Sequence, residues 1–510
     1  MGKKIKLFSG GLVISVLFAT LFFSALPQRS SVDAGVNNGY YGKKAKYIFY
    51  FIGDGMGMPQ ITATEIFKGT LSSNHPMNKE SLSFTVFPHL GMQTTHSANS
   101  FITDSAAAGT ALATGHKTDN NVLGMDPTKR IKFKTIAEMA KAKGLKVGII
   151  SSVSLDHATP AAFYAHEGSR TNQYDIGIAM VNSGFDYFAG GSLLQPTGKA
   201  KDKMNVLEIA KQTGYKIVNE QDSIMKLTKN DGKVIAFSAD LAAESAMQYS
   251  IDRKNRITLA DYTKKGIEML DNPMGFFMMV EGGKIDWSSH ANDAATTVQD
   301  VLAFDQAVIE ALKFYAQHPD ETLIVVTGDH ETGGMTVGFA GTKYTTAFKK
   351  ISQQTLSFEE FDKVIKDYRT VVGSGGANLE DWLSFLSEKF GLTEFSDFEE
   401  SRLQDSLAAS MKDSNQRTTN EQAYLLYGGY EPFSVTVTHL LNQRAGIGWT
   451  TYAHTGVALP LYAQGVGGEL FEGSYDNTDV AKKIMNIMGG PISAVNYYCR
   501  IYHFLLYQKA

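Results

Sequence analysis

The sequence is short of cysteine and of net charge, and both shortages limit what the protein can be. Cys499 is the only cysteine among 510 residues, so no disulfide can form within the chain. The formal net charge is −4, which gives no general reason to expect a nucleic acid or an anionic membrane surface as a partner. Hydrophobic residues make up 43% and charged residues 20%, a composition typical of a folded chain with a sizeable core.

The first 34 residues have the layout of a secretory signal. Three lysines precede a mostly apolar run from residue 7 to residue 26, and a polar stretch leads to a cleavage site with small residues at Val32 and Ala34. The run is about 20 residues long, which is also long enough to stay in a membrane. We expect an exported protein, periplasmic or extracellular, in which residues 1–34 are a cleaved signal peptide or an N-terminal membrane anchor.

From about residue 45 onward, β-rich runs alternate with helical patterns. The runs expected to be strands are residues 47–52, 145–153, 276–280 and 323–326. Strands that are apolar throughout are buried on both faces, as in a parallel sheet covered by helices. Residues 294–315 place apolar side chains on one stripe, as an amphipathic helix does. We predict an α/β fold, a three-layer sandwich with a large, mostly parallel central sheet flanked by helices.

Residues 341–445 show a different pattern, in which short capped helices replace strands. Ser357 followed by Glu360 resembles a capping box at a helix start. We expect a helical insertion, either a lid or an interface element, within a domain that extends over residues 45–490. The tail, residues 491–510, is rich in tyrosine, and its sequence indicates no role.

Polar residues stand where the predicted strands end. Asp54, Glu281, Asp329 and His330 each follow or close an apolar run. In open α/β sheets the carboxyl ends of the strands form the edge where ligands bind. Residues that are far apart in the sequence are therefore expected to meet at one edge of the sheet.

Several of these positions have the chemistry of metal ligands. Asp286 and His290 are spaced so that they share one face if a helix begins there; the alternative is an ordinary surface pair. Asp329 and His330 are adjacent at a strand end, so their side chains could bind one ion only if the backbone turns there. The alternative interpretation is a turn with a structural histidine. His454 in a glycine-containing loop is a weaker signal. Carboxylates and imidazoles without cysteine favour catalytic rather than structural zinc.

Ser105 precedes an alanine-rich segment, residues 106–113, that is expected to form a helix. At a helix N-terminus, backbone N–H groups and the helix dipole favour a phosphate oxygen or a serine alkoxide. The alternative interpretation is an ordinary helix cap. No Gly-x-Ser-x-Gly sequence surrounds Ser105, so its activation would come from a metal rather than from a histidine base.

Taken together, these segments resemble the alkaline phosphatase family. The resemblance covers residue 47 to about residue 490, and the matching segments occur in the family's order. They are residues 51–57; 103–107 with 114–118; 158–162 with 169–170; 280–286; 327–334; and 454–456.

The resemblance implies a site for two zinc ions and a third metal, usually magnesium. The implied ligands are Asp286, His290 and His454 for the first zinc, Asp54, Asp329 and His330 for the second, and Asp54, Thr159 and Glu281 for the third metal. Ser105 would be the nucleophile that is transiently phosphorylated. Arg170 would grip two phosphate oxygens, a task suited to a planar guanidinium, and Asp104 would orient Arg170. The resemblance also implies small-molecule phosphate monoesters as substrates, no requirement for nucleic acid, and a homodimer.

Two positions depart from the best-known enterobacterial form, which has aspartate and lysine there. They are His157 and Trp287, and both alternatives occur elsewhere in the family. An imidazole at His157 could bind the third metal directly and would favour zinc over magnesium. The loss of a lysine at Trp287 predicts weaker binding and faster release of phosphate.

Two other functions compete with this hypothesis. A phosphodiesterase or sulfatase of the same superfamily is the first, although sulfatases carry a Cys/Ser-x-Pro-x-Arg segment and Ser105 is followed by alanines. A non-catalytic envelope protein that binds phosphate or zinc is the second. A complete ligand set together with Ser105 and Arg170 argues against it.

Overall fold

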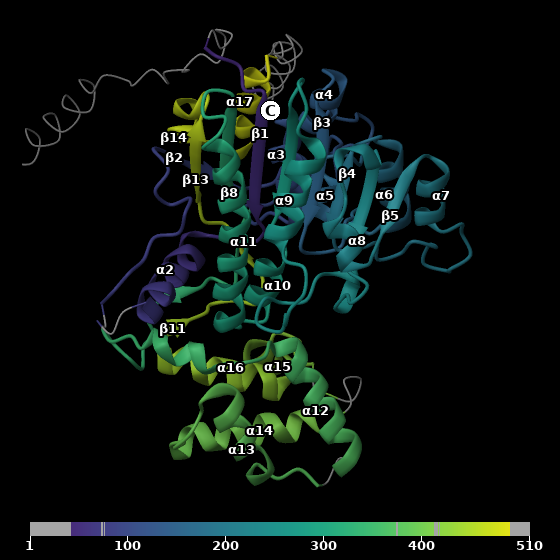
Figure 1. Cartoon of the computed structure of the whole chain (residues 1–510). Coiled ribbons are helices and arrows are strands. Elements are labelled where there is room, and N and C mark those ends of the chain that lie inside the picture. Colours follow the sequence, from purple (N-terminus) through teal and green to yellow (C-terminus); the bar gives the residue numbers. More distant parts are fainter. Residues whose placement is uncertain are drawn as a thin grey trace, which may run out of the picture. The chain divides into compact units, whose positions relative to one another are not determined.

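A ten-stranded sheet forms the middle layer of the fold, in the order β14-β2-β13-β8-β1-β7-β3-β4-β6-β5 (Figure 1). The computed structural model describes residues 42–72, 75, 77–373, 376–412, 417 and 419–489, all within one compact unit, Gly42–Gly490. The strands of the sheet are β1 Tyr47–Gly53, β2 His89–Thr94, β3 Lys146–Ser151, β4 Tyr187–Gly190, β5 Tyr215–Val218, β6 Lys233–Phe237, β7 Phe276–Glu281, β8 Thr322–Gly328, β13 Leu459–Gly465 and β14 Gly473–Asp476.

Parallel pairing dominates this sheet. Only β13 runs antiparallel to its neighbours β8 and β2, and the other neighbouring strands pair in parallel. The central strands β1, β7 and β8 are buried at every position, because helices cover both faces. The structure therefore confirms the predicted α/β fold with its large, mostly parallel sheet.

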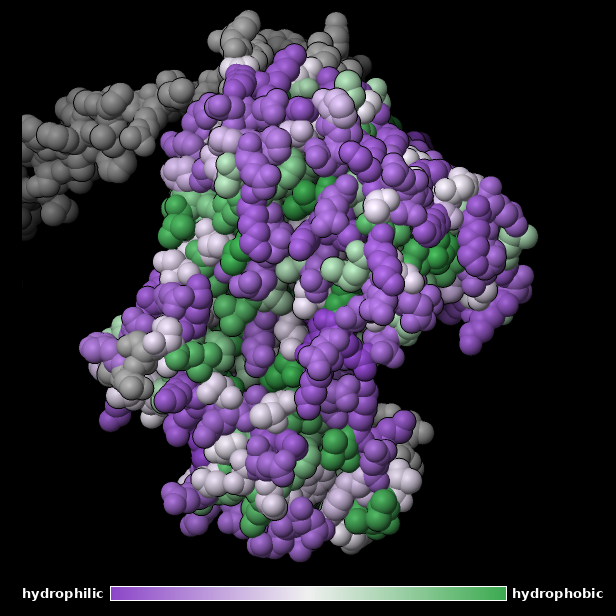
Figure 2. Space-filling model, viewed as in Figure 1, coloured by the Kyte–Doolittle hydropathy of each residue, from purple (hydrophilic) through white to green (hydrophobic). Residues whose placement is uncertain are grey.

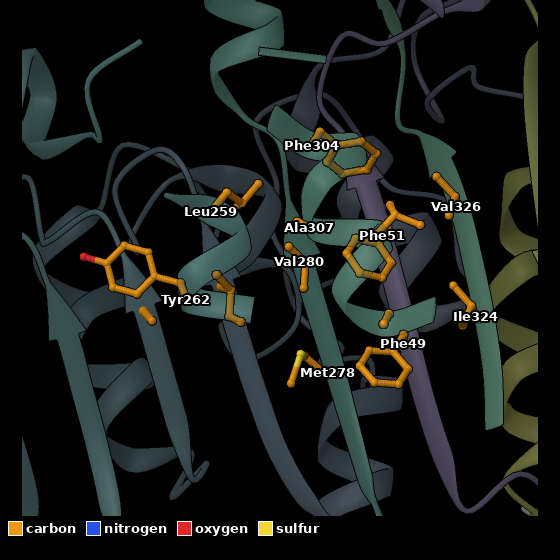
Figure 3. Packing of buried hydrophobic residues seen from close by; sticks show 14 of the residues in the cluster. Phe49, Phe51, Leu259, Tyr262, Met278, Val280, Phe304, Ala307, Ile324 and Val326 are labelled. Atoms are coloured by element: carbon orange, nitrogen blue, oxygen red, sulfur yellow. The ribbon is translucent and has the colours of Figure 1, made fainter. Parts of the chain in front are cut away.

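One face of the sheet packs on α9 (Leu259–Leu270) and α11 (Ala294–Tyr315), which also contact each other. Alternate residues of β1 point toward α11, and the rings of Phe51 and Phe304 lie 5.9 Å apart (Figure 3). The bounds of α11 are those predicted from the apolar stripe. A large cluster of buried hydrophobic residues lies on this face.

The opposite face packs on a second layer of helices. The side chain of Tyr50 in β1 points there, with its ring 6.0 Å from that of Phe163. The helices of this layer are α3 Ser105–Thr114, α4 Ile136–Ala142, α5 Ala158–Ala161 and α17 Asn477–Ile487. Because successive residues of a strand point to opposite faces, the continuous apolar run of β1 supplies side chains to both helix layers.

Shorter elements connect and flank these layers. They are α2 Met58–Ser72, α6 Gln173–Asn182, α7 Val206–Gln212, α8 Gln221–Met225, α10 Lys284–His290, and the 3₁₀ turns η1 Lys229–Asp231, η2 Ala243–Ser245 and η5 Gly468–Phe471. Two two-stranded ladders stand apart from the main sheet: β9 Glu331–Thr332 with β12 His454–Thr455, and β10 Thr336–Val337 with β11 Ile447–Gly448.

A helical region lies between β10 and β11 in the chain and is drawn in green in Figure 1. Its elements are η3 Phe348–Gln353, α12 Phe358–Val372, α13 Glu380–Phe390, α14 Asp397–Ser410, α15 Glu421–Tyr427 and α16 Pro432–Ala445. Its buried side chains form a separate hydrophobic cluster, to which α2 and the start of α11 also contribute. Ser357 caps α12 by accepting from Glu360 N, but the reciprocal half of the predicted capping box is replaced by an ion pair, in which Glu360 accepts from Lys363.

Hydrophilic residues dominate the face of the molecule shown in Figure 2. In the part of the chain that the structure describes, no helix combines the length and the apolar character needed to cross a bilayer. The predicted signal peptide or anchor at residues 1–34 and the tail at residues 491–510 lie outside the described residues.

Candidate active site

The carboxyl ends of three central strands bring the predicted polar residues together. In register, Ile52 of β1 lies beside Glu281 of β7 and Thr327 of β8. Asp54 directly follows β1, and Asp329 directly follows β8. Asp54, Glu281 and Asp329 are fully buried, so three carboxylates share one water-poor edge of the sheet.

The first cluster consists of Asp286, His290 and His454. The Nε2 atoms of the two histidines are 3.1 Å apart, and Asp286 Oδ1 lies 3.4 Å from His290 Nε2 and 3.7 Å from His454 Nε2. Asp286 and His290 belong to α10, a separate short helix rather than the start of α11. The chain turns between the two helices at Asn292, whose φ is 53°.

The second cluster consists of Asp54, Asp329 and His330. His330 Nε2 lies 3.2 Å from Asp54 Oδ1 and 3.6 Å from Asp329 Oδ2. The first and second clusters are adjacent, because the imidazole rings of His330 and His454 stack with centroids 3.6 Å apart.

The third cluster consists of Asp54, His157 and Glu281. His157 Nδ1 lies 3.9 Å from a carboxylate oxygen of each acidic residue. Thr159 Oγ1 lies beside them, 3.5 Å from Asp54 Oδ2 and 3.4 Å from Asp329 Oδ2. All the positions that the resemblance assigned to metals are thus brought together at one edge.

The donor atoms of these clusters fit metal ions. Among the described residues, Asp54 Oδ1 and Glu281 Oε1 are buried without a hydrogen-bond partner, an arrangement that is costly unless a cation compensates it. Burial, together with the nearby carboxylates of Asp329, Asp286 and Glu281, raises the pKa of Asp54 well above its usual range. Bound cations would remove this mutual repulsion and keep the carboxylates ionised.

Hydrogen bonds at the far ring nitrogens orient the histidines. His290 Nδ1 lies 2.6 Å from the carbonyl oxygen of Tyr452, and His454 Nδ1 lies 2.8 Å from that of Thr103. Each Nδ1–H donates to a carbonyl, which leaves Nε2 free to bind a metal. Burial and His330 lower the pKa of His454 to about 3, so its imidazole is neutral, the form that binds metals.

Glu331 is a buried residue that the sequence analysis did not single out. Its carboxylate accepts from Gln60 Nε2 at 2.8 Å, Thr455 Oγ1 at 2.5 Å, Gly334 N at 3.2 Å and Met335 N at 3.1 Å. These bonds hold the β9–β12 ladder, which pairs Thr332 with His454. Glu331 therefore fixes the loop of His454 against the strand end that carries His330.

Ser105 is the first residue of α3, and it is not the helix cap. Asp104 caps the helix, with Oδ1 accepting from Ala107 N at 3.0 Å. Ser105 Oγ is consequently free of the helix backbone and lies 3.1 Å from His330 Nε2. The alternative interpretation of Ser105 as the cap is wrong, because the preceding aspartate occupies that position.

Arg170 is held by two side chains. Its Nη1 donates to Asp104 Oδ2 at 3.3 Å, and its Nη2 lies 3.0 Å from His157 Nε2. Asn121, a residue not anticipated from the sequence, links the pair: its N–H donates to Asp104 Oδ2 at 3.0 Å and its carbonyl accepts from Arg170 N at 2.8 Å. Asn121 has a φ of 77°, a backbone conformation that asparagine tolerates better than most residues.

The two departures from the family pattern contact each other. The rings of His157 and Trp287 meet edge to face, with centroids 5.9 Å apart and an interplanar angle of 76°. Because a guanidinium only donates, His157 Nε2 is the acceptor in its contact with Arg170. A neutral His157 in this arrangement carries its proton on Nδ1, which is the ring atom that faces Asp54 and Glu281.

A serine at a helix N-terminus, surrounded by carboxylate–histidine clusters and an arginine at one edge of an α/β sheet, defines a metal-dependent hydrolase. A sequence profile of the alkaline phosphatase family matches residues 45–189 and 183–489. The chain therefore belongs to the alkaline phosphatase family, whose members are phosphoric monoester hydrolases.

Individual relatives agree with this assignment. Alkaline phosphatase 4 of Bacillus subtilis is 32% identical over 486 residues, which cover 93% of this chain and 95% of the relative. The crystal structure of the cold-active alkaline phosphatase of a psychrophilic Shewanella shares 30% identity and a TM-score of 0.73, over 87% of this chain and 99% of that one. A histidine-to-glutamate variant of the TAB5 alkaline phosphatase, with magnesium bound, shares 26% identity and a TM-score of 0.60, over 88% and 99%.

Proposed function

We propose that this protein hydrolyses small-molecule phosphate monoesters through a phosphoserine intermediate on Ser105. The observation that supports it most directly is the position of Ser105 Oγ, which lies 3.1 Å from His330 Nε2 in the second cluster. At the first position of α3, the same serine lies where backbone N–H groups and the helix dipole stabilise negative charge.

Each side chain of the site has a task in this reaction. Ser105 Oγ loses its proton to water and attacks phosphorus, the bond from phosphorus to the ester oxygen breaks, and the alcohol leaves after taking a proton from water. A second water molecule then attacks the phosphoserine, and the bond from phosphorus to Ser105 Oγ breaks to release inorganic phosphate. Arg170 binds phosphate oxygens with its planar guanidinium. Asp104 and His157 hold that guanidinium in place, at 3.3 and 3.0 Å. Holding reactants in line accounts for much of the catalysis of phosphoryl transfer.

The three clusters would hold the metal ions. Asp286, His290 and His454 would hold one zinc, and Asp54, Asp329 and His330 would hold the other. When bound, such ions neutralise the phosphate, lower the pKa of the attacking oxygen and stabilise the leaving oxygen.

The third position would be held by Asp54, Thr159 and Glu281. With His157 Nε2 accepting from Arg170, the donors left at that position are oxygens, which suit magnesium. Zinc would be favoured there only if His157 turned its ring away from Arg170 and offered a nitrogen to the metal.

Activity and metal content of Ser105→Ala test this proposal. The variant should lose roughly 10³-fold or more of its turnover of p-nitrophenyl phosphate, because the attacking oxygen is gone, while its zinc and magnesium content stays at the wild-type level. Mass spectrometry of the wild type, quenched during turnover, should find phosphate on Ser105. Turnover that survives the substitution would refute the mechanism. Preference for bis-p-nitrophenyl phosphate would instead favour a phosphodiesterase.

We also propose that the protein is exported, to the periplasm or the extracellular space, and acts as a homodimer. The apolar run at residues 7–26 supports export, and the family resemblance supports the dimer. Fractionation of expressing cells with N-terminal sequencing would show either cleavage near Ala34 or an intact, membrane-bound chain. Sedimentation analysis of the purified protein would contradict the dimer if it gave the mass of a single chain.

A further inference from the structure

Lys284 is a buried cation that no step of the proposed reaction uses. It begins α10, and its side chain is wholly enclosed. Its Nζ lies 3.4 Å from Glu359 Oε2, 3.5 Å from the ring centre of Tyr249 and 4.7 Å from that of Trp287. Enclosing an ammonium group is costly, and here a carboxylate and two aromatic faces compensate it.

Trp287 connects this cation to the active site. It follows Lys284 by three residues on α10, so both side chains lie on the same face of the helix. The indole ring also contacts the imidazole of His157, with ring centroids 5.9 Å apart, and His157 accepts from the guanidinium of Arg170. A continuous series of contacts therefore runs from Lys284 to Arg170.

The helical region supplies the far end of this series. Glu359 lies in the first turn of α12, and its second oxygen accepts from Ala243 N at 3.3 Å. The neighbouring Phe358 packs its ring 5.6 Å from that of Tyr249 and donates its N–H to Asp293 at 3.0 Å. The carboxylate that faces Lys284 is thus held in place by contacts on both sides.

We propose that Lys284 is a positioning residue for Trp287. Through the contact between Trp287 and His157, it fixes the position from which the Arg170 guanidinium binds phosphate. Glu359 fixes Lys284, so α12 contributes to phosphate affinity without touching the substrate. The inference rests on the proposed function in one respect, that Arg170 binds a phosphate group. A purely structural Lys284 would instead change stability alone, whatever residue stands at position 287.

A double-mutant cycle separates these two roles. Lys284→Met keeps the unbranched side chain and removes its charge, and Trp287→Ala removes the ring that the charge would position. The readouts are the Kd of inorganic phosphate by calorimetry on the metal-loaded protein, and the separate KM and kcat for p-nitrophenyl phosphate. Calorimetry reports phosphate binding even in a protein that hydrolyses no monoester, so a failure of the inference is distinguishable from a failure of the proposed function.

Lys284→Met should weaken phosphate binding about five- to tenfold in the otherwise wild-type protein, the range of a buried cation–aromatic contact. It should raise KM by a similar factor and change kcat less than about twofold. In the Trp287→Ala background the same substitution should change the Kd less than about twofold. An equal effect in both backgrounds, or no effect in either, would overturn the proposal.

Glu359→Gln gives a second, milder cycle, because it removes the paired charge and leaves Lys284 in place. Its expected effect on the phosphate Kd is roughly two- to threefold, again only where Trp287 is present. This cycle decides the question by the same criterion if Lys284→Met does not fold. Glu360→Gln is the matched control, since Glu360 is next in α12 but pairs with the exposed Lys363; it should leave the Kd unchanged.

Discussion

Asp104 performs two tasks with its two carboxylate oxygens. Oδ1 caps α3 by accepting from Ala107 N, and Oδ2 accepts from Arg170 and from the backbone of Asn121. One side chain thus fixes both the helix that presents Ser105 and the guanidinium beside it. A serine at position 104 could retain the first task and not the second, so the two are separable by experiment.

Replacing Asp104 with serine and with alanine should separate the cap from the arginine contact. Asp104→Ala should lower the free energy of unfolding by about 1 kcal/mol through loss of the cap, and Asp104→Ser should retain most of it. Both should raise the KM for p-nitrophenyl phosphate to a similar degree, because neither holds Arg170. Denaturant unfolding and steady-state kinetics measure the two effects. A normal KM in Asp104→Ser would mean that Arg170 needs no carboxylate partner.

Glu331 is the second residue whose role follows from its hydrogen-bond partners. Glu331→Gln places an amide NH₂ among groups that all donate hydrogen bonds, so at least one buried donor loses its partner. We expect a loss of about 2–4 kcal/mol of stability and a lower zinc content, since the loop of His454 is no longer fixed. Thermal unfolding and metal analysis measure both. The control is Glu388→Gln, whose carboxylate is 69% exposed and whose replacement should change neither.

The sequence identified the candidate ligands that gather at this site, and it did not identify the residues that support them. Asp54 and Asp329 could be predicted because each follows an apolar strand whose end forms a binding edge. Glu331 and Asn121 could not, because their importance depends on partners such as Gln60 and Thr455 that are distant in the sequence. The contact between His157 and Trp287 was missed for the same reason, although each position was noted by itself.

Among the elements, the strands with a continuous apolar run and the long helix with a periodic apolar stripe were predictable. The strands β1 and β8 and the helix α11 follow directly from their sequences. The strand β14 forms one edge of the sheet, and β2 lies next to it. Most positions of both strands are exposed or half-buried, so no strand was predicted there. The antiparallel direction of β13 depends on its pairing with β8 and β2, and no local pattern specifies the direction of a strand.

The helix α12 contains a titrating group that affects stability. Burial raises the pKa of Asp362 to about 8, with Glu431 acting in the same direction and Ser434 and Arg417 opposing it. In the unfolded chain an aspartate loses its proton near pH 4. Between about pH 4 and pH 8 the folded protein therefore binds more protons than the unfolded chain, and stability falls as the pH rises through this window.

Asp362→Asn removes this titration and keeps the size of the side chain. Relative to the wild type, the variant should gain stability progressively from about pH 4 to pH 8, and the difference should then remain constant at several kcal/mol at most. Denaturant unfolding at a series of pH values measures the difference. A difference that does not vary with pH would show that Asp362 titrates normally.

At the scale of the whole molecule, the three candidate metal-binding clusters bring the layers of the fold together. Their side chains come from the ends of β1, β7 and β8, from α10, from α5 and from the β12 segment. Segments from nearly the full length of the described chain therefore meet at this one edge of the sheet. Ions bound there would link these segments and favour the folded state.

Removing the metals should consequently destabilise the protein as well as inactivate it. We expect chelator-treated protein to unfold at a Tm lower by roughly 5–15 °C, and zinc together with magnesium should restore both Tm and activity. Differential scanning calorimetry of the treated and reconstituted protein measures the shift. The variant Asp286→Asn should show a smaller response to the chelator, because one cluster lacks its carboxylate. An unchanged Tm after verified metal loss would contradict this role.

The short ladder between β10 and β11 has a consequence for how such a protein can evolve. Thr336 and Val337 pair with Gly448 and Ile447. The two ends of the helical region are therefore held together before the chain continues to His454. Lengthening a loop that is already closed adds little entropy cost, about 0.6 kcal/mol for each doubling. Chain can therefore be added to or removed from this region over generations, and new surfaces can arise on it, while the chemistry at the edge of the sheet stays as it is.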